Sequence, residues 1–413
     1  MNIDRNHVAV IGAGVTGLTA ADTLAGWGAR VSLVEKTPFL GGHAIQLNCK
    51  ATDACVKCGA CVAEDKLLRA TRHPHVDVYT GTQIETISGQ RPYRIAYRTH
   101  SPLVNADQCD ECGICFDTCP VSGAISQGHT PHGGPYVAIR RDLCRYFDHA
   151  ACTQCQDACP QGAIVLSSQA QAGTMQADAI LLTTGFTPYD PSDKPYGYGQ
   201  FPNVITSLDA ERLLREHTVM KRPSDGRPAR RIAFIQCVGS RDARLGHPWC
   251  SKICCGSSLR MARLIQSRQE DTQITCFYID VQTFGKDFQP VYRNIRDNIA
   301  MIRAIPGDIL RTATDELEVV YFDPQSHASK EAVFDIVVLS VGLLPAEGNG
   351  TMAQTLDWTQ DESGFMPSHG SERHPAPEGI FTAGAATGPM TIAESVSSAQ
   401  ESVYDMVRFL TAS

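Results

Sequence analysis

The sequence predicts an α/β protein of two dinucleotide-binding domains, with a small cysteine-rich domain inserted into the first. Three observations carry this prediction. A glycine-rich turn lies between two apolar runs near the N-terminus, regularly spaced cysteines fill the segment 109–159, and a second series of apolar runs begins at residue 231. The chain has 413 residues, which is enough for two or three domains with cores of their own.

The N-terminal segment has the pattern of a βαβ unit. His7–Ile11 and Arg30–Val34 are apolar runs typical of buried parallel strands, and Thr16–Gly28 between them is typical of a helix. The connecting turn reads Gly12-Ala13-Gly14-Val-Thr-Gly17, whose glycines permit a tight turn and the close approach of a pyrophosphate. Glu35 follows Gly17 by 18 residues, where a carboxylate can bind a ribose. The segment therefore predicts a dinucleotide site.

Three later segments favour FAD as this dinucleotide, because they are similar to motifs of two-dinucleotide-domain flavoproteins of the thioredoxin-reductase type. Each could be a plain turn at a strand end, but the three occur in the expected order. An Asp usually follows the last glycine of the third motif, and Ala385 replaces it here. The segments are Glu35-Lys36-Thr-Pro-Phe-Leu-Gly41-Gly42-His43, Thr183-Thr184-Gly185-Phe186 and Gly379-Ile-Phe-Thr-Ala-Gly384-Ala385. The residues expected to hold FAD are Gly12, Ala13, Gly14, Gly17, Glu35, Lys36, Gly42, His43, Thr184, Gly185, Gly384 and Ala385.

These motifs divide the FAD-binding domain into three stretches, 1–100, 169–220 and 341–413. A strand at Arg231–Gln236, a helix at Ser257–Arg268 and a strand at Gln273–Ile279 predict a second Rossmann-like domain over 221–340. Its first strand runs into Gln236-Cys-Val-Gly-Ser-Arg241 and not into a GxGxxG turn, so we expect no nicotinamide fingerprint there. Arg260 and Arg263 are expected to lie on a solvated face of the helix.

The inserted segment, 101–168, is rich in Cys, Gly, Pro and Asp and shows little periodicity. We therefore expect a small ferredoxin-like domain held by two [4Fe–4S] clusters and not by an apolar core. Cys109-x2-Cys112-x2-Cys115-x3-Cys119-Pro is the bacterial ferredoxin run, and Cys152-x2-Cys155-x3-Cys159-Pro repeats its second half. Since the fourth cysteine of each run binds the other cluster, cluster one should take Cys109, Cys112, Cys115 and Cys159, and cluster two Cys119, Cys144, Cys152 and Cys155. A pair of zinc sites is the disfavoured alternative.

Two other cysteine groups leave more than one interpretation open. Cys237, Cys250, Cys254 and Cys255 could hold a third [4Fe–4S] cluster or could be structural. Cys49, Cys55, Cys58 and Cys61 could bind a further cluster, could include a redox disulfide between Cys55 and Cys58, or could be structural. Of the 17 cysteines, only Cys276 stands outside the four groups.

Composition narrows the classes of partner and compartment. The net charge is −8 with no long basic run, so we expect neither a nucleic-acid surface nor a polybasic membrane anchor. No stretch of about 18 apolar residues occurs, and the first strand begins too early for a signal peptide. Clustered cysteines in a reducing compartment favour metal binding over disulfides. A cytoplasmic location is expected, with docking on the cytoplasmic face of a membrane only through a partner protein.

With these motifs in place, nearly the whole chain resembles the A subunit of heterodisulfide reductases. The resemblance rests on the glycine turn, the two ferredoxin runs and several specific phrases. These phrases are Gly41-Gly-His43, Asp53-Ala-Cys55-x2-Cys58, Thr184-Gly-Phe186, Ile235-Gln-Cys-Val-Gly-Ser-Arg-Asp242, Cys250-Ser-Lys-Ile-Cys-Cys255, Tyr278-Ile-Asp-Val281, Phe284-Gly-Lys286 and Gly384-Ala-Ala386-x-Gly388-Pro389. The resemblance strengthens the expectation of a cluster at Cys237, Cys250, Cys254 and Cys255.

Within this family, the chain is most similar to the A subunit of quinone-interacting membrane-bound oxidoreductases. That resemblance implies a FAD and iron–sulfur electron-transfer component of an oxidoreductase, whose partners are a second flavoprotein of the same family and a membrane haem subunit. It also implies electron exchange between a quinone pool and adenylylsulfate reductase. Alternatives are an electron-bifurcating or sulfur-oxidising member of the same family, an NAD(P)H-dependent flavoenzyme and a thiol–disulfide protein.

Overall fold

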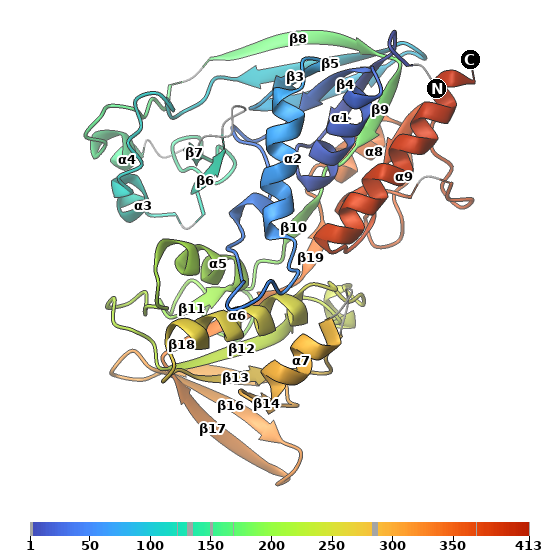
Figure 1. Ribbon diagram of the computed structural model, residues 1–413. Helices are drawn as coiled ribbons and strands as arrows, with labels where there is room; N and C mark the ends of the chain where they lie inside the picture. The colour runs from blue at the N-terminus through green and yellow to red at the C-terminus, as the bar shows by residue number, and fades with distance from the viewer. Residues whose placement is uncertain are drawn as a thin grey trace.

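Two parallel sheets, one in each half of the molecule, organise the computed structural model (Figure 1). The structure describes residues 3–121, 123–129, 135–148, 152–167, 169–282, 288–368 and 370–412. The phrase Phe284-Gly-Lys286 lies outside these residues. Within them, no helix is long and apolar enough to cross a membrane.

The first sheet is formed from strands that are far apart in the sequence. Its order is β20-β9-β1-β2-β3, and every neighbouring pair is parallel. Helices α1, α2 and α9 cover one face, where their apolar side chains form a common core with β1 and β2 (Figure 1). The bounds are β1 His7–Ile11, β2 Arg30–Val34, β3 Val76–Tyr79, β9 Ala179–Leu182, β20 Ile380–Thr382, α1 Val15–Gly26, α2 Ala60–Arg72, α9 Ile392–Thr411 and the 3-10 turn η1 Ala44–Gln46.

The opposite face of this sheet packs against a three-stranded antiparallel sheet, β4-β5-β8, and against the segment that contains helix α8. These strands are the chain segments that lead into and out of the cysteine-rich insertion. The insertion therefore leaves the first domain from one edge and returns to it. The bounds are β4 Thr82–Ser88, β5 Tyr93–His100, β8 Ala170–Ala177 and α8 Asn349–Thr355.

The second parallel sheet has the order β11-β18-β12-β13-β14. Helices α5 and α6 pack on one face, and the antiparallel sheet β15-β16-β17 packs on the other. Strand β11 belongs to this sheet, although its residues fall in the stretch predicted for the FAD-binding domain. The bounds are β11 Val204–Thr206, α5 Ser207–Glu216, β12 Arg231–Val238, η2 Ala243–Leu245, α6 Cys254–Arg268, β13 Gln273–Phe277, α7 Phe288–Arg296, β14 Ala300–Ile302, β15 Asp308–Arg311, β16 Leu317–Asp323, β17 Ala328–Phe334 and β18 Ile336–Val341.

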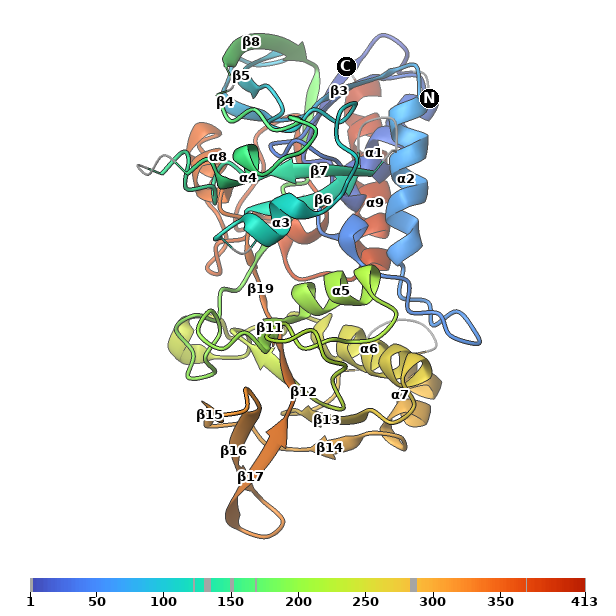
Figure 2. The same ribbon diagram turned by 90° about the vertical axis from the view of Figure 1, so that its left-hand side faces the viewer.

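Short elements join the two halves. Strands β10, Phe186–Pro188, and β19, Leu343–Pro345, pair antiparallel between the sheets. The 3-10 turn η3, Gly384–Thr387, leads into α9. The segment between η1 and α2 extends from the first half down to α6 of the second (Figures 1 and 2). This extended segment, residues 47–59, is called the crossing loop below.

The insertion does have an apolar core, contrary to the prediction that clusters alone hold it. Its elements are α3 Ile114–Thr118, β6 Ile125–His129, β7 Pro135–Ile139 and α4 Gln154–Asp157. Buried residues from β6 and β7 pack with Leu103, Val104 and Ile164 and also with Phe39 of the first domain. The six cysteines Cys109, Cys115, Cys119, Cys144, Cys155 and Cys159 pack on this core. The insertion is thus seated on the first domain by apolar contacts as well as by its flanking strands.

Candidate cofactor sites

The glycine turn after β1 is packed so closely that two of its glycines cannot be replaced. Gly12 has φ +107°, and a Cβ there would lie 2.3 Å from the carbonyl oxygen of Thr183. A Cβ on Gly17 would lie 1.9 Å from the carbonyl oxygen of Gly12 and 2.7 Å from Thr183 Oγ1. Thr183 Oγ1 in turn donates to Gly12 O at 2.7 Å. The turn, the helix and the end of β9 are therefore held together at backbone distance, and Thr183 is a partner that the sequence analysis did not select.

Beside this packing, the turn leaves space of the kind a pyrophosphate needs. A Cβ on Gly14 would meet no atom within 4 Å, and no side chain caps α1 at this residue. The N–H groups of the first helical turn are available to an anion at the positive end of the helix dipole. Gly42, with φ +56°, brings its own backbone against Gly14, where a Cβ would lie 3.1 Å from Gly14 Cα. The structure thus brings Gly14 and Gly42 together, as a shared dinucleotide site would require.

Glu35 accepts a hydrogen bond from the backbone of the glycine turn. Its carboxylate is 7% exposed and accepts hydrogen bonds from the Ala13 N–H at 2.8 Å and from Thr37 N–H and Oγ1, each at 2.9 Å. Each carboxylate oxygen has further acceptor capacity for a ribose hydroxyl. Lys36, the next residue, is exposed. The geometry fits Glu35 as a ribose ligand, while the part of Lys36 in holding FAD stays a prediction.

The two remaining flavin motifs converge on the same turn. Gly384, with φ +69°, is so close to Thr16 that a Cβ would lie 2.1 Å from its Oγ1, and Ala385 beside it is buried. Thr184 Oγ1 donates to Asn349 Oδ1 at 2.8 Å, and Gly185 turns with φ +72°. Asn349 is fully buried, yet its Nδ2 has no partner among the described residues. A buried amide without an acceptor fits a polar ligand at this position, and no periodic pattern in the sequence marks it.

His43 lies where the insertion approaches the flavin motifs. Its ring stacks on Phe186 with 4.6 Å between centroids, and its Nε2 lies 3.3 Å from Phe186 O. Burial lowers the pKa of His43 to about 4, and the charges of Arg140 from the insertion and of Lys36 act in the same direction. His43 is therefore a neutral imidazole at pH 7, able to line a flavin without adding charge.

The low pKa of His43 makes stability depend on pH. Because the unfolded histidine titrates near 6.5 and the folded one near 4, the unfolded chain binds more protons between these values. The free energy of unfolding should therefore fall by about 2 kcal/mol between pH 7 and pH 5 from this residue alone. His43→Leu should remove that part of the slope, measured from urea denaturation at both pH values. Parallel pH profiles for the two proteins would contradict the assignment.

The close packing of Gly17 predicts a large difference between two glycines of the same helix. Gly17→Ala should displace the turn from Thr183 and abolish retention of flavin, since its Cβ would overlap Gly12 O. Gly26→Ala is the matched control, because a Cβ at Gly26 meets nothing within 4 Å. It should keep flavin and gain up to about 1 kcal/mol of stability from helix propensity. Equal flavin content in the two purified variants would refute the role of Gly17.

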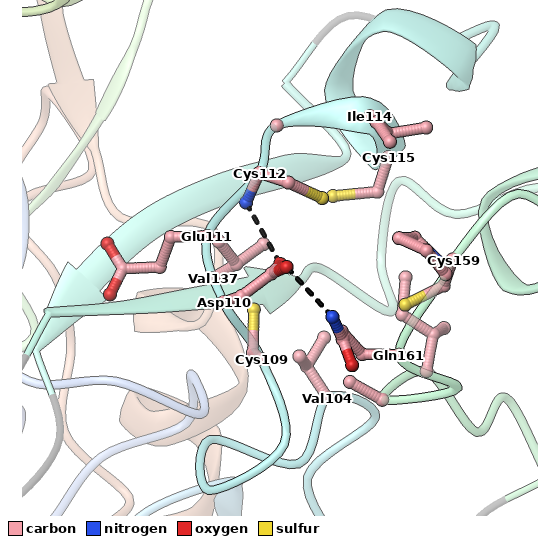
Figure 3. Close-up of a pocket in the computed structure, with 14 residues that line it drawn as sticks. Val104, Cys109, Asp110, Glu111, Cys112, Ile114, Cys115, Val137, Cys159 and Gln161 are labelled. Atoms are coloured by element: carbon pink, nitrogen blue, oxygen red, sulfur yellow. Dashed lines mark hydrogen bonds between the residues drawn. The ribbon is translucent and has the colours of Figure 1, made fainter.

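The structure brings the ferredoxin cysteines together in the crossed grouping. Cys109, Cys112, Cys115 and Cys159 line one cavity in the insertion, with Val104, Val137 and Ile164 as its apolar wall (Figure 3). Cys159 reaches this cavity from the second run, behind α4. Asp110 and Gln161 join the two runs by a hydrogen bond of 3.0 Å at the rim. The four thiols predicted for cluster one thus share a single enclosure.

The four thiols predicted for cluster two also lie near one another: Cys119, Cys144, Cys152 and Cys155. Burial, followed by the proximity of Cys144 and Cys119, raises the pKa of the Cys155 thiol to about 11, and Cys152 acts on Cys144 in the same way. Burial likewise raises the pKa of Cys115 in the first set to about 11. Without iron, the Cys115 and Cys155 thiols are therefore protonated at neutral pH, and iron binding would release their protons.

The third group, Cys237, Cys250, Cys254 and Cys255, comes together at the end of β12 and the start of α6. Burial raises the pKa of Cys237 to about 11, and the nearby Cys255 and Cys250 add to the effect. Cys254 is fully enclosed and its pKa is raised by burial and then by the other three thiols. The helix begins at Cys254, three residues before its predicted start, so both adjacent cysteines sit in its first turn.

Around the third group, two buried polar side chains have an oxygen without a hydrogen-bond partner among the described residues, and one cysteine has a left-handed backbone conformation. The buried Gln236 Oε1 and Ser240 Oγ have no partner in the described part of the chain. Cys237 itself has φ +61°, which a non-glycine residue rarely adopts. Arg241, which hydrogen-bonds Cys237, is held by both carboxylate oxygens of Asp280. Lys252 pairs with Glu394 at the start of α9, at 3.3 Å, and so ties this group to the flavin-side domain.

The N-terminal group is more open. Cys49, Cys55 and Cys61 are exposed, and Cys58 is partly buried. In the described residues, no three His, Cys, Asp or Glu side chains lie close enough to hold a single metal ion. A cubane, in contrast, places one thiolate at each of four corners, so its ligands surround a cluster of iron and sulfide and not one ion.

The prediction that Arg260 and Arg263 lie on a solvated face of the helix is wrong, because both side chains contact the crossing loop. Arg260 is half-buried over the ring of Phe288 and donates to Val56 O at 3.0 Å. Arg263 forms an ion pair with Asp53. Both side chains fasten the crossing loop to α6.

Comparisons with known proteins agree with this architecture. The family model for the NAD(P)-binding Rossmann-like domain matches residues 10–60. Thioredoxin reductase from T. acidophilum superimposes with a TM-score of 0.54 over 98% of this chain and 99% of that one, at 15% identity. The fold is therefore that of two-dinucleotide-domain proteins of the thioredoxin-reductase type.

Sequence relatives define the family more narrowly. The A subunit of the H2:CoB–CoM heterodisulfide, ferredoxin reductase of Methanothermobacter marburgensis is 31% identical over 94% of this chain and 62% of its own length. An iron–sulfur A subunit of the CoB–CoM heterodisulfide reductase of Methanopyrus kandleri is 33% identical over the same shares. The chain belongs to the family of heterodisulfide reductase A subunits, and it spans less than two thirds of the length of these relatives.

Proposed function

We propose that this protein is a FAD and iron–sulfur electron-transfer component of a larger oxidoreductase. The observation that carries the proposal is the crossed assembly of two ferredoxin runs on a domain whose three flavin motifs converge on one glycine turn. FAD exchanges electrons in pairs and [4Fe–4S] clusters exchange them singly, so together they connect two kinds of carrier.

The residues of the chain have distinct parts in this proposal. Gly12, Gly14 and Gly17 admit the pyrophosphate, and Glu35 receives the ribose. The eight ferredoxin cysteines hold two clusters, and Cys237, Cys250, Cys254 and Cys255 hold a third. The insertion contacts the flavin side through Phe39 in its core and through β6, which packs against η1 beside His43. These contacts would keep the carriers at fixed separations.

The third group occupies the position where a second dinucleotide site would begin. Strand β12 ends at Val238, and Cys237 with Gly239 and Ser240 replaces a glycine fingerprint. Gly239 is covered by the ring of Tyr189, with a Cβ position only 2.1 Å from it. Tyr189 therefore fills space that a nicotinamide dinucleotide would need, which favours electron entry from a protein partner.

Quantification of flavin, iron and sulfide in anaerobically purified protein tests the proposal. One FAD and at least about twelve irons are expected, at four irons per cubane for the three clusters of this proposal. NADH and NADPH should not bleach the flavin at a useful rate, while dithionite should bleach it at once. Rapid bleaching by either nicotinamide, or an iron content near zero, would overturn the proposal.

The finer assignment rests on the resemblance of the sequence. We infer from it that the protein works at the cytoplasmic face of a membrane, with a second flavoprotein of its family and a membrane haem subunit, between a quinone pool and adenylylsulfate reductase. Purification from native membranes should recover those partners, and a quinol should reduce the flavin of the complex. Recovery with a ferredoxin-reducing or heterodisulfide-reducing assembly instead would reject this assignment and retain the electron-transfer role.

A further inference from the structure

Two cysteine segments in different parts of the chain have the same sequence pattern and the same backbone. Cys55-Val-Lys-Cys-Gly-Ala-Cys61 and Cys109-Asp-Glu-Cys-Gly-Ile-Cys115 both read Cys-x-x-Cys-Gly-x-Cys. The residue before the second cysteine is left-handed in each, with φ +50° at Lys57 and +57° at Glu111. The following glycines have φ +79° and +80°, and each is the N-cap of a helix, α2 or α3.

The same turns direct a backbone N–H at a sulfur atom. Lys57 N–H donates to Cys55 Sγ at 3.4 Å, and Glu111 N–H donates to Cys109. The third group has the same kind of turn. Just before α6, the N–H of Lys252, which has φ +61°, donates to Cys250 Sγ at 3.3 Å. Donation to sulfur stabilises the thiolate form, which is the form that binds iron.

Backbone strain is concentrated in these places. Of the eight non-glycine residues with positive φ among the described residues, five lie within the cysteine groups: Lys57, Glu111, Cys237, Arg241 and Lys252. Such conformations persist where the surroundings require them, and they gather at functional sites. The left-handed Lys57 between two cysteines therefore matches Glu111 at the equivalent position of the first ferredoxin run.

We propose that Cys55, Cys58 and Cys61 bind a further [4Fe–4S] cluster on the crossing loop. The site goes beyond the proposed function, which uses only the other three groups. Each thiol would release its proton as it binds iron. Cys49, which is exposed on the same loop, is the thiol of this chain that could complete the fourth corner.

Arg260 connects this turn to the third group. Its guanidinium donates to Val56 O, inside the turn, and to Gly256 O, directly after Cys255. Cys58 is also close enough to act on the pKa of Arg260. Val56 is buried, whereas Cys55 and Cys61 are exposed. The site would therefore be the surface end of a path that starts at the third group.

Iron analysis of Cys58→Ser decides the proposal. Wild-type protein, purified anaerobically, should contain about sixteen irons, and Cys58→Ser should contain about four fewer with unchanged flavin. The Lys57→Gly variant is the matched control, because glycine adopts the left-handed turn freely and keeps all three thiols. It should retain the full iron content. Electron paramagnetic resonance of the reduced proteins should show one signal missing only in Cys58→Ser.

Two results would overturn the inference. The first is a wild-type content of about twelve irons that Cys58→Ser does not change, which would leave the proposed function intact. The second is a Cys55–Cys58 disulfide in the anaerobically purified protein, found by mass spectrometry, which would assign thiol–disulfide chemistry to the loop. A wild-type iron content near zero would instead refute the proposed function itself. Loss of flavin together with iron in Cys58→Ser would show misfolding, and Cys61→Ser would then be compared by the same criterion.

Discussion

The double variant Cys109→Ser/Cys159→Ser should lose one cluster, and Cys109→Ser/Cys119→Ser should lose two. In the crossed grouping, Cys109 and Cys159 line the same cavity (Figure 3), while Cys119 lies with Cys144 and Cys155. The first pair therefore removes ligands from one cubane, and the second pair removes a ligand from each. The expected losses are about four and about eight irons per flavin, measured with acid-labile sulfide on anaerobically purified protein.

The outcome separates two ways of wrapping the chain. If each run bound its own cluster, the two double variants would exchange their iron contents. Cys276→Ala is the control for the loss of a buried cysteine outside the four groups, and it should keep the full complement. Both double variants must retain flavin, since their substitutions lie in the insertion and leave the glycine turn untouched.

Lys50→Met should be the most destabilising single charge removal on the crossing loop. Lys50 and Glu211 form an ion pair at 2.6 Å with side chains 3% and 2% exposed. Asn48 N–H and Ser257 Oγ add hydrogen bonds to the same carboxylate, at 3.0 and 3.3 Å. Removing the lysine leaves a buried carboxylate without its counter-charge, which costs about 3–5 kcal/mol. The midpoint of urea denaturation and the melting temperature should both fall accordingly.

Two further variants test whether the loss of stability in Lys50→Met comes from the buried ion pair. The pair Arg30–Asp77 has side chains 65% and 46% exposed, so Arg30→Met should cost less than about 1 kcal/mol. The double variant Lys50→Met/Glu211→Gln should recover part of the loss, because no uncompensated charge remains. A cost for Lys50→Met no greater than that for Arg30→Met would show that the pair does not join the two halves.

The flavin motifs were accessible to sequence analysis because each is a short local pattern at a strand end. Gly12, Thr184 and Gly384 each follow an apolar run, and parallel strands place such ends along one edge of a sheet. The thioredoxin-reductase type of fold was therefore predicted correctly. The crossed spacing of the ferredoxin run predicted which thiols the structure brings together, although their role as ligands stays a prediction.

Long-range contacts were not accessible in this way. Lys50 and Glu211 are 161 residues apart, and Arg260 and Val56 are 204 residues apart, so no periodicity relates them. Asn349 starts a helix of only seven residues after a turn, where nothing in the local sequence marks it. The core of the insertion was missed because its strands are five residues long, too short to show a clear alternation. Helix α2 was missed because its buried face consists of three alanines and Leu67, which make only a weak apolar pattern.

The contacts of the crossing loop affect how the rate of electron transfer should depend on solvent viscosity. Its buried ion pair, together with Arg260 and the Asp53–Arg263 pair, holds the second half of the molecule at one orientation to the first. Electrons would then pass between centres whose separation does not change during turnover. The rate should accordingly be independent of solvent viscosity, whereas a protein that must rotate one domain between half-reactions slows as glycerol or sucrose is added.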